Sequence, residues 1–256
     1  MQPGDLCLTF DDNLLCQYKV ALPVLRQFGL TAFWFVYTSV NQGNAERLEI
    51  YRHFRTVAFP GIDAFYTAFD AFLVNRPEAD MVAEARGSFQ PKAYLPDYVY
   101  LSDNDKIFRY VRDRVLGRER YEAAMDAMLA HYGFDMGQLL GVLWMGDAHL
   151  KELHGEGHVI GLHSHTHPTL LEALSVAEQR EEYRSNASHL TALLGELPRA
   201  VSHPNNSYSP ETLKILAEMG VTTGFRANMT DATNAALELP RHNHAVIHRS
   251  LSETRQ

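Results

Sequence analysis

The stretch GHVIGLHSHTHP, residues 157–168, carries the features that decide the fold. Its first half, HVIGLH (158–163), is a short apolar and β-prone run that ends on a polar residue, which predicts a buried strand. Pro168 disfavours helical geometry at His167 and is well suited to open a helix, so we expect a turn after His163. Polar residues directly after a buried strand are typical of the active-site edge of parallel α/β folds.

The path of this turn determines which two histidines can bind the same metal ion. In a fully extended chain His163 and His167 would lie about 13 Å apart, because a strand rises roughly 3.3 Å per residue. A turn brings His163 and His167 together, whereas a continued strand favours His163 and His165. Two neutral imidazoles and one carboxylate from another strand end would leave positions open for water, which is typical of a catalytic metal site.

Alternating strand and helix patterns flank this stretch on both sides. Before it, Leu6 to Phe10 and residues 31–37 (TAFWFVY) predict strands with a helix over 17–28 between them. After it, we expect a helix from Ser175 to about Leu194, a strand at 199–203, a helix over 209–220, a strand at 221–225 and a last strand near 237–247. This order predicts an α/β fold on a parallel sheet, either barrel-like or doubly wound.

Residues 43 to 143 depart from this alternation. Stretches such as IDAFYTAFDAFLVNR (62–76) and RERYEAAMDAMLAHYG (118–133) have helical composition and show no repeat period. We therefore predict a large helical insertion at about 43–143 within a single domain that covers residues 1–256.

Composition limits the possible partners. The 256 residues include Lys+Arg 23 and Asp+Glu 31, a formal charge of −8, which argues against nucleic acid and anionic membranes as partners. The two cysteines, Cys7 and Cys16, do not suggest a disulfide framework, and no apolar run approaches the roughly 18 residues of a membrane span. We expect a cytoplasmic protein. Histidine is the unusual component, because six of the 13 fall between residues 149 and 167.

Two further polar clusters follow predicted strands. Asp11 and Asp12 follow the first strand. His203 ends the fourth strand, and Asn205 and Asn206 come directly after it. Because the carboxyl ends of parallel strands meet at one edge of a sheet, we expect both clusters near the histidines. Two adjacent carboxylates raise each other's pKa unless a cation or hydrogen-bond donors offset the repulsion.

These residues resemble the motifs of the polysaccharide deacetylase family, the NodB-homology fold of carbohydrate esterase family four. The TFDD motif is matched by residues 9–12, and the motif of a histidine, Ser or Thr, two variable residues, a second histidine and usually proline is matched by residues 163–168. The resemblance covers about 5–40 and 145–245. It implies a distorted (β/α) barrel and a hydrolase of non-peptide carbon–nitrogen bonds, which removes acetyl groups from an N-acetylated, sometimes O-acetylated, sugar with a metal ion.

The resemblance also implies roles for single residues. Asp12, His163 and His167 would be metal ligands and Asp11 the general base, while His165 falls on a variable position. The ion is expected to be one divalent metal, zinc in the first place, with cobalt or nickel as alternatives.

The family's third motif is altered in this chain. Family members have an arginine that contacts the base, followed by proline, an aromatic residue and glycine, but Ser202 or His203 occupies the arginine's place here. Arg241 is our candidate substitute. For the general acid we consider His242 and His244, which alternation along the last predicted strand would place on one face; His248 is a weaker third choice. Substrate contacts are assigned to His203, Asn205 and Tyr208.

Two other functions stay open at this point. The altered third motif would change the cleft, so the same fold and metal would also suit a hydrolase of a non-sugar, cyclic amide. The missing arginine would also suit a carbohydrate-binding protein that has lost catalysis. The complete Asp-Asp and His-His pairs favour the deacetylase, because a binding protein has no need of a catalytic base.

Overall fold

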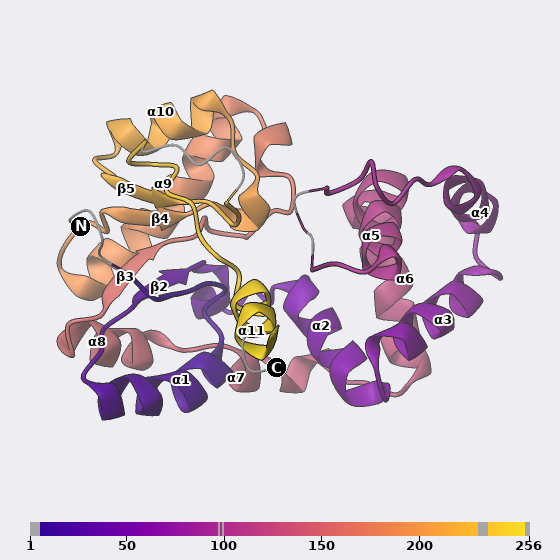
Figure 1. The fold of residues 1–256 in the computed structure, drawn as a ribbon, viewed down its shortest axis with the longest axis horizontal. Helices are drawn as coiled ribbons and strands as arrows, with labels where there is room; N and C mark the ends of the chain where they lie inside the picture. Colours follow the sequence, from indigo (N-terminus) through magenta and orange to yellow (C-terminus); the bar gives the residue numbers. More distant parts are fainter. Residues whose placement is uncertain (1–5, 97, 99, 230–234, 254–256) are drawn as a thin grey trace. The chain divides into compact units, whose positions relative to one another are not determined.

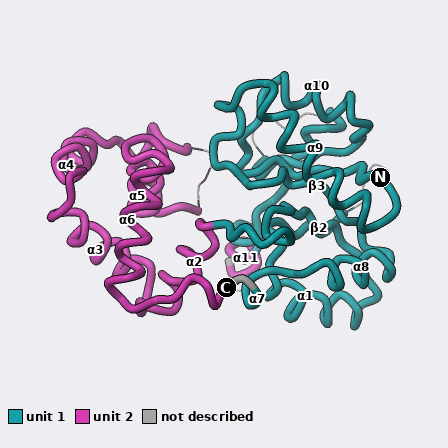
Figure 2. The backbone as a smooth tube through the Cα atoms, turned by 180° about the vertical axis from the view of Figure 1, so that it is seen from behind, with its two compact units in different colours: residues 1–46, 140–247 teal, residues 47–139, 248–256 magenta. Residues whose placement is uncertain are grey.

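The computed structural model describes residues 6–96, 98, 100–229 and 235–253, and the chain divides into two compact units (Figure 2). The first unit consists of Met1–Glu46 and Leu140–Ile247, and the second of Arg47–Leu139 and His248–Gln256. The second unit thus takes up most of the stretch from 43 to 143 in which an insertion was predicted. That the whole chain forms a single domain stays a prediction.

The first unit is built on five parallel strands in the order β1-β2-β3-β4-β5 (Figure 1). The strands are β1 (Thr9–Phe10), β2 (Phe33–Val36), β3 (Val159–Leu162), β4 (Ala200–Ser202) and β5 (Thr223–Phe225). A parallel sheet whose spatial order equals its chain order is the arrangement of a (β/α) barrel, and these strands curl into half of one. The predicted α/β fold with a distorted barrel is confirmed.

Helices pack against this sheet and bury its apolar side chains. They are α1 (Leu15–Phe28), α8 (Asp147–Gly155), α9 (Val176–Leu194) and α10 (Pro210–Glu218), while the short α7 (Leu140–Leu143) lies against α1. Trp34, Leu162 and Val201 of the strands belong to one buried cluster with residues of the helices, among them Tyr183 and Leu190 of α9. Each such side chain contributes about 1.5–3 kcal/mol through its removal from water. This packing fixes the strand ends that carry the polar clusters.

The described residues of the second unit are mainly helical. Its helices are α2 (Arg47–Ala58), α3 (Ile62–Leu73), α4 (Ala79–Ser88), α5 (Asp103–Tyr110) and α6 (Gly117–His131), and a π-helical turn, Val111–Leu116, separates the last two. An aromatic cluster holds them together: the Phe108 ring lies 5.5 Å from the centroids of both Phe65 and Phe69. Among the described helices of both units, none combines the length and the apolar composition needed to cross a membrane.

The last predicted strand is only partly present. We call residues 235–241 the closing segment, because it runs alongside β5: Leu239 forms a parallel bridge with Phe225, and the Arg226 N–H donates to the Leu239 carbonyl over 2.9 Å. The strand predicted up to 247 is wrong beyond this point. Pro240 has no N–H to continue a ladder, and α11 (His244–Glu253) begins four residues later.

Candidate metal centre

The candidate site collects side chains from the carboxyl ends of neighbouring strands. Asp11 and Asp12 follow β1, His163 follows β3, and Ser202 is the last residue of β4. Asp12 and the next residue, Asn13, have φ angles of 77° and 56°, so the chain turns sharply as soon as the strand ends. Residues other than glycine rarely adopt this left-handed conformation, and they do so most often at functional sites.

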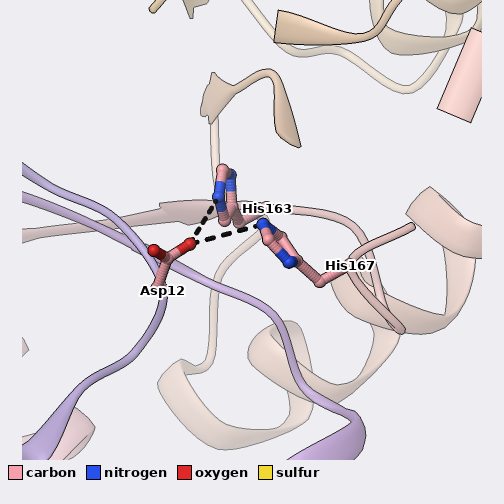
Figure 3. Close-up of side chains that lie close together, drawn as sticks. All are labelled: Asp12, His163 and His167. Atoms are coloured by element: carbon pink, nitrogen blue, oxygen red, sulfur yellow. Dashed lines mark ion pairs between the residues drawn. The ribbon is translucent and has the colours of Figure 1, made fainter. Parts of the chain in front are cut away.

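Asp12, His163 and His167 form a compact group of potential ligands (Figure 3). The Asp12 Oδ1 atom lies 3.3 Å from Nε2 of His163 and 3.3 Å from Nε2 of His167. Ligand atoms on one tetrahedral zinc ion lie about 3.3 Å from one another when each is about 2.0–2.1 Å from the metal. The spacing and the N, N, O chemistry of the donors therefore fit a single divalent ion.

A backbone carbonyl orients one imidazole, and an aromatic ring orients the other. The His163 Nδ1–H donates to the Ser202 carbonyl over 2.8 Å, and because a carbonyl can only accept, Nε2 keeps the lone pair that a metal needs. The His167 ring stacks on the Tyr37 ring at 5.0 Å. The side chains of both histidines are buried, with 3% and 6% of their surface exposed.

The charge balance of this group favours a cation. Burial alone lowers the pKa of His163, but its hydrogen bond to Asp12 and the charges of Asp11 and Asp12 outweigh this effect and raise the pKa above its ordinary value. The same carboxylates would stabilise a divalent ion in place of the proton.

His165 lies on the other side of the turn. Its Nδ1 is 3.0 Å from the Thr38 hydroxyl oxygen, and it does not belong to the group of potential ligands. Of the two pairings that the sequence left open, the structure brings together His163 and His167. The turn between them, in which Ser164 and His167 have φ angles of 61° and 55°, produces this pairing.

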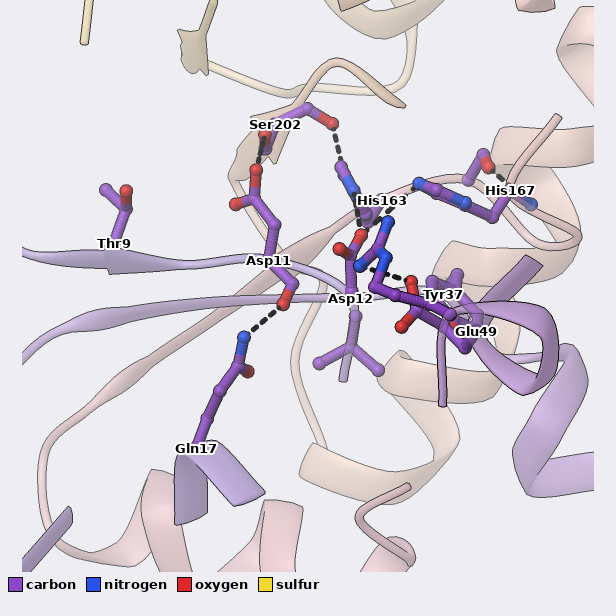
Figure 4. Close-up of polar contacts among 12 residues, drawn as sticks. Thr9, Asp11, Asp12, Gln17, Tyr37, Glu49, His163, His167 and Ser202 are labelled. Carbon is purple, nitrogen blue, oxygen red and sulfur yellow. Dashed lines mark hydrogen bonds and ion pairs between the residues drawn. The ribbon is translucent and has the colours of Figure 1, made fainter. Parts of the chain in front are cut away.

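Asp11 lies beside the potential ligands and is held by Arg241 (Figure 4 shows the surroundings of Asp11). Two nitrogens of the Arg241 guanidinium donate to the two carboxylate oxygens of Asp11 over 2.9 and 2.8 Å. The Ser202 hydroxyl donates a hydrogen bond of 2.9 Å to the Asp11 carboxylate and accepts one of 2.8 Å from the Arg241 guanidinium. The Ser202 hydroxyl thus bridges the Asp11 carboxylate and a guanidinium that comes from the closing segment.

This ion pair sets the protonation state of Asp11. Burial alone raises the pKa of Asp11, but the charge and hydrogen bonds of Arg241, with a smaller effect of His163, hold the pKa below its ordinary value. Asp11 is therefore a carboxylate at neutral pH and is able to accept a proton.

The remaining predicted residues are more scattered. His242, His244 and His248 are exposed, and His244 opens α11, so His242 and His244 do not share a strand face as predicted. His203 is buried; its Nε2–H donates to the Leu237 carbonyl over 2.8 Å. Its ring stacks on Tyr208 at 4.1 Å, and the Tyr208 hydroxyl donates to Glu238. Asn205 is exposed.

Sequence reasoning missed several residues that hold the site together. Asn186 of α9 accepts from the His163 N–H over 3.0 Å and donates to the Val36 carbonyl over 2.9 Å, which ties two strand ends to one helix. Glu182, one helical turn earlier, accepts hydrogen bonds from the backbone N–H groups of His165 and Thr166, in the turn between the two potential ligands. In the sequence, Glu182 and Asn186 are marked only by their spacing of four residues, which places them on one face of a predicted helix. This spacing does not show which part of the protein that face contacts.

Comparison with known proteins was made by sequence and by structure. Residues 122–224 match the family described as polysaccharide deacetylase, a stretch that includes His163 and His167 but not Asp11 and Asp12. The deacetylase PplD of Streptococcus pyogenes, solved in complex with acetate, superposes with a TM-score of 0.50 at 18% identity; the match covers 92% of this chain and 62% of that one. The predicted resemblance to the polysaccharide deacetylase family is confirmed. At this identity, the structural likeness establishes the fold.

Other solved structures with the polysaccharide deacetylase fold resemble the chain less. IcaB from Ammonifex degensii gives a TM-score of 0.49 at 16% identity, with 100% of this chain and 75% of that one covered. The BpsB deacetylase domain from Bordetella bronchiseptica gives 0.48 at 15% identity, with 92% and 69% covered. Curated protein sequences give no match. The chain thus spans only 62% of the length of PplD, the first of these structures.

Proposed function

We propose that this protein is a metal-dependent deacetylase that hydrolyses the acetamide, or an acetyl ester, of an N-acetylated sugar or polysaccharide. One observation carries the proposal: the carboxylate of Asp12 meets Nε2 of both His163 and His167 at 3.3 Å, directly beside a second carboxylate, Asp11, that Arg241 holds ionised. A ligand set with positions left for water and an adjacent base are the two requirements of metal-assisted hydrolysis.

Asp12, His163 and His167 would hold one divalent ion, zinc in the first place. When bound, such an ion supplies a water of lowered pKa and polarises the acyl oxygen. The buried positions of both imidazoles keep their nitrogens fixed in the absence of the ion, because Ser202 and Tyr37 hold the rings.

Asp11 would act as the general base. Arg241 binds both of its oxygens, so the carboxylate plane is fixed, and the low pKa keeps the group ionised, the form that can accept a proton from the attacking water. In this proposal, Arg241 performs the part that the family gives to the arginine of the third motif. It reaches Asp11 from the closing segment instead of from the end of β4.

The general acid would be His242 or His244. Both are exposed, so either can exchange protons with solvent. Of the residues assigned to the substrate, exposed Asn205 and half-buried Tyr208 would contact the sugar, whereas buried His203 would support the Tyr208 ring from behind.

Acetate release from a panel of acetylated sugars, together with the bound metal per chain, tests this function. Asp12→Ala or His163→Ala should abolish metal binding and turnover. Asp11→Asn should keep the metal and lose turnover by about 10²- to 10⁴-fold, the usual effect of removing a general base. Substitution of His242 and His244 in turn identifies the acid.

Two outcomes would contradict the proposal. Bound metal without acetate release from any sugar, but with ring opening of a cyclic amide, would move the substrate away from sugars. Sugar binding without turnover in metal-loaded protein would indicate a protein that has lost catalysis.

A further inference from the structure

The turn that carries the two histidines has a costly backbone. Ser164 and His167 both have left-handed φ angles, 61° and 55°, although neither is glycine. Such conformations cost about 1–3 kcal/mol each and persist when surrounding contacts enforce them. Since the His167 imidazole reaches Asp12 only in this conformation, the contacts that enforce the turn also determine where its Nε2 atom lies.

Glu182 provides the main set of these contacts. Its Oε2 accepts from the His165 N–H over 2.9 Å and from the Thr166 N–H over 2.8 Å. Its Oε1 accepts from the Thr166 hydroxyl over 2.6 Å. Hydrogen bonds to an ionised acceptor are roughly twice as strong as those between neutral groups, so one carboxylate holds the two central residues of the turn.

Glu182 acts from the same helix face as Asn186. The two residues are four positions apart on α9, which places them one above the other on the helix. Asn186 binds the His163 N–H at the start of the turn, and Glu182 binds its middle. Tyr183 and Leu190 of the same helix are fully buried in the core of the first unit, so α9 is a rigid support.

We propose that Glu182 is a positioning residue for the metal centre: it shapes the turn in advance so that the imidazoles of His163 and His167 face one ion. The hydrogen bonds described for Glu182 go to the backbone of His165 and Thr166 and to the Thr166 hydroxyl, so it acts through the turn. The inference rests on the proposed function, because it assumes that these imidazoles bind a metal.

Zinc titration of the full chain, followed by calorimetry and repeated with cobalt for its absorption spectrum, tests this role. Glu182→Ala should weaken zinc affinity by about 10- to 100-fold, the usual effect of removing a group that orients ligands. Glu182→Gln should restore most of the affinity, because an amide oxygen accepts the two N–H groups and the Thr166 hydroxyl can accept from the amide nitrogen. The matched control is Glu181→Ala, since Glu181 is exposed on α9 and bonds only to Ser185 and Arg184 among the described contacts.

Thr166→Val keeps the inference testable if Glu182→Ala does not fold. This variant removes one of the three donors and should bind zinc with an affinity between those of wild type and Glu182→Ala. Equal zinc affinity in wild type, Glu182→Ala and Thr166→Val would overturn the role of Glu182 and leave the proposed function intact. Failure of the wild type itself to bind zinc or cobalt would overturn the proposed function, and the role of Glu182 with it.

Discussion

At the scale of single residues, the pairing of Asp11 with Arg241 carries the greatest consequence. Arg241 binds both carboxylate oxygens, and Ser202 bridges the pair, so two side chains, one from the end of β4 and one from the closing segment, fix the orientation of one carboxylate. Lysine presents a single point charge and cannot reproduce the planar, two-pronged contact. The chemistry of the site therefore depends on the guanidinium and not only on its charge.

Arg241→Lys should accordingly lower kcat/KM for acetate release by about 10²-fold, since a base displaced by about 1 Å loses this much. Metal content should stay near one ion per chain, because the hydrogen bonds described for Arg241 go to Asp11, Ser202, Thr9 and the Arg226 carbonyl. Arg199→Lys is a matched control at an exposed position. Wild-type turnover in Arg241→Lys would contradict the role of the guanidinium.

A second prediction at this scale concerns pH and His203. Burial lowers the pKa of His203 from 6.5 to about 4. Between these two pH values, His203 is therefore protonated in the unfolded chain and neutral in the folded chain. This contribution to stability is complete above about pH 6.5 and is lost as pH falls to about 4; it amounts to about 3 kcal/mol. In His203→Gln, which keeps a donor for the Leu237 carbonyl, the free energy of unfolding should fall less over this range.

Denaturant unfolding of both proteins at several pH values measures this difference. Other titrating groups, such as His163, affect wild type and variant alike and cancel in the comparison. Parallel pH curves for the two proteins would show that folding does not lower the pKa of His203.

Residue types in short motifs were the part of the site that sequence could predict. Asp11, Asp12, His163 and His167 stand in two local patterns, and Pro168 indicated a turn after His163, but not the left-handed φ angles of Ser164 and His167. Glu182 and Asn186 were missed because their role depends on which side of α9 faces the turn. That orientation is a tertiary property, set by the burial of Tyr183 and Leu190.

At the scale of elements, the closing segment determines whether Arg241 reaches Asp11. It lies tightly against β5, where a Cβ atom on Gly224 would come within 2.3 Å of the Leu237 carbonyl oxygen. Only glycine permits this approach. The bond from the Arg241 Nε–H to the Arg226 carbonyl, 2.7 Å long, then directs the guanidinium towards the sheet edge.

Gly224→Ala should therefore push the closing segment away from β5, with a loss of stability of about 1–3 kcal/mol or more. Turnover should fall, because Arg241 would no longer reach Asp11. Metal affinity should be kept, because the potential ligands follow β1 and β3 and not β5. Gly155→Ala, at the end of α8 with nothing within 4 Å of the added Cβ, is the control. A Gly224→Ala protein with wild-type stability and turnover would contradict this account of the closing segment.

The order of elements was more predictable than their lengths. Leu6 to Phe10 is β-prone, yet only Thr9 and Phe10 pair with β2, and the Leu6 side chain is 99% exposed. A strand extends only as far as a neighbour offers partners, and that limit is not encoded in the strand itself. The same reason applies to the stretch after Pro240, where a helix replaces the predicted strand.

At the scale of the whole molecule, two units share one chain, and the candidate site is assembled within the first. Its residues are separated by up to 230 positions, as in the bond between Asp11 and Arg241, and the parallel sheet brings them to one edge. The alternation of strands and helices predicts this convergence. The two matched motifs, residues 9–12 and 163–168, both lie in the first unit. Sequence patterns therefore predicted the helical structure of the second unit but indicated no function for it.

The central claim is that Asp12, His163 and His167 hold one divalent metal ion. A crystal structure of the full chain grown with zinc, with anomalous data collected at the zinc edge, tests it most directly. We predict one strong peak within about 2.0–2.2 Å of a carboxylate oxygen of Asp12 and of Nε2 of both histidines, with Asp11 beside it and paired to Arg241. A map with no peak at these residues, or with zinc bound to other side chains, would contradict the account.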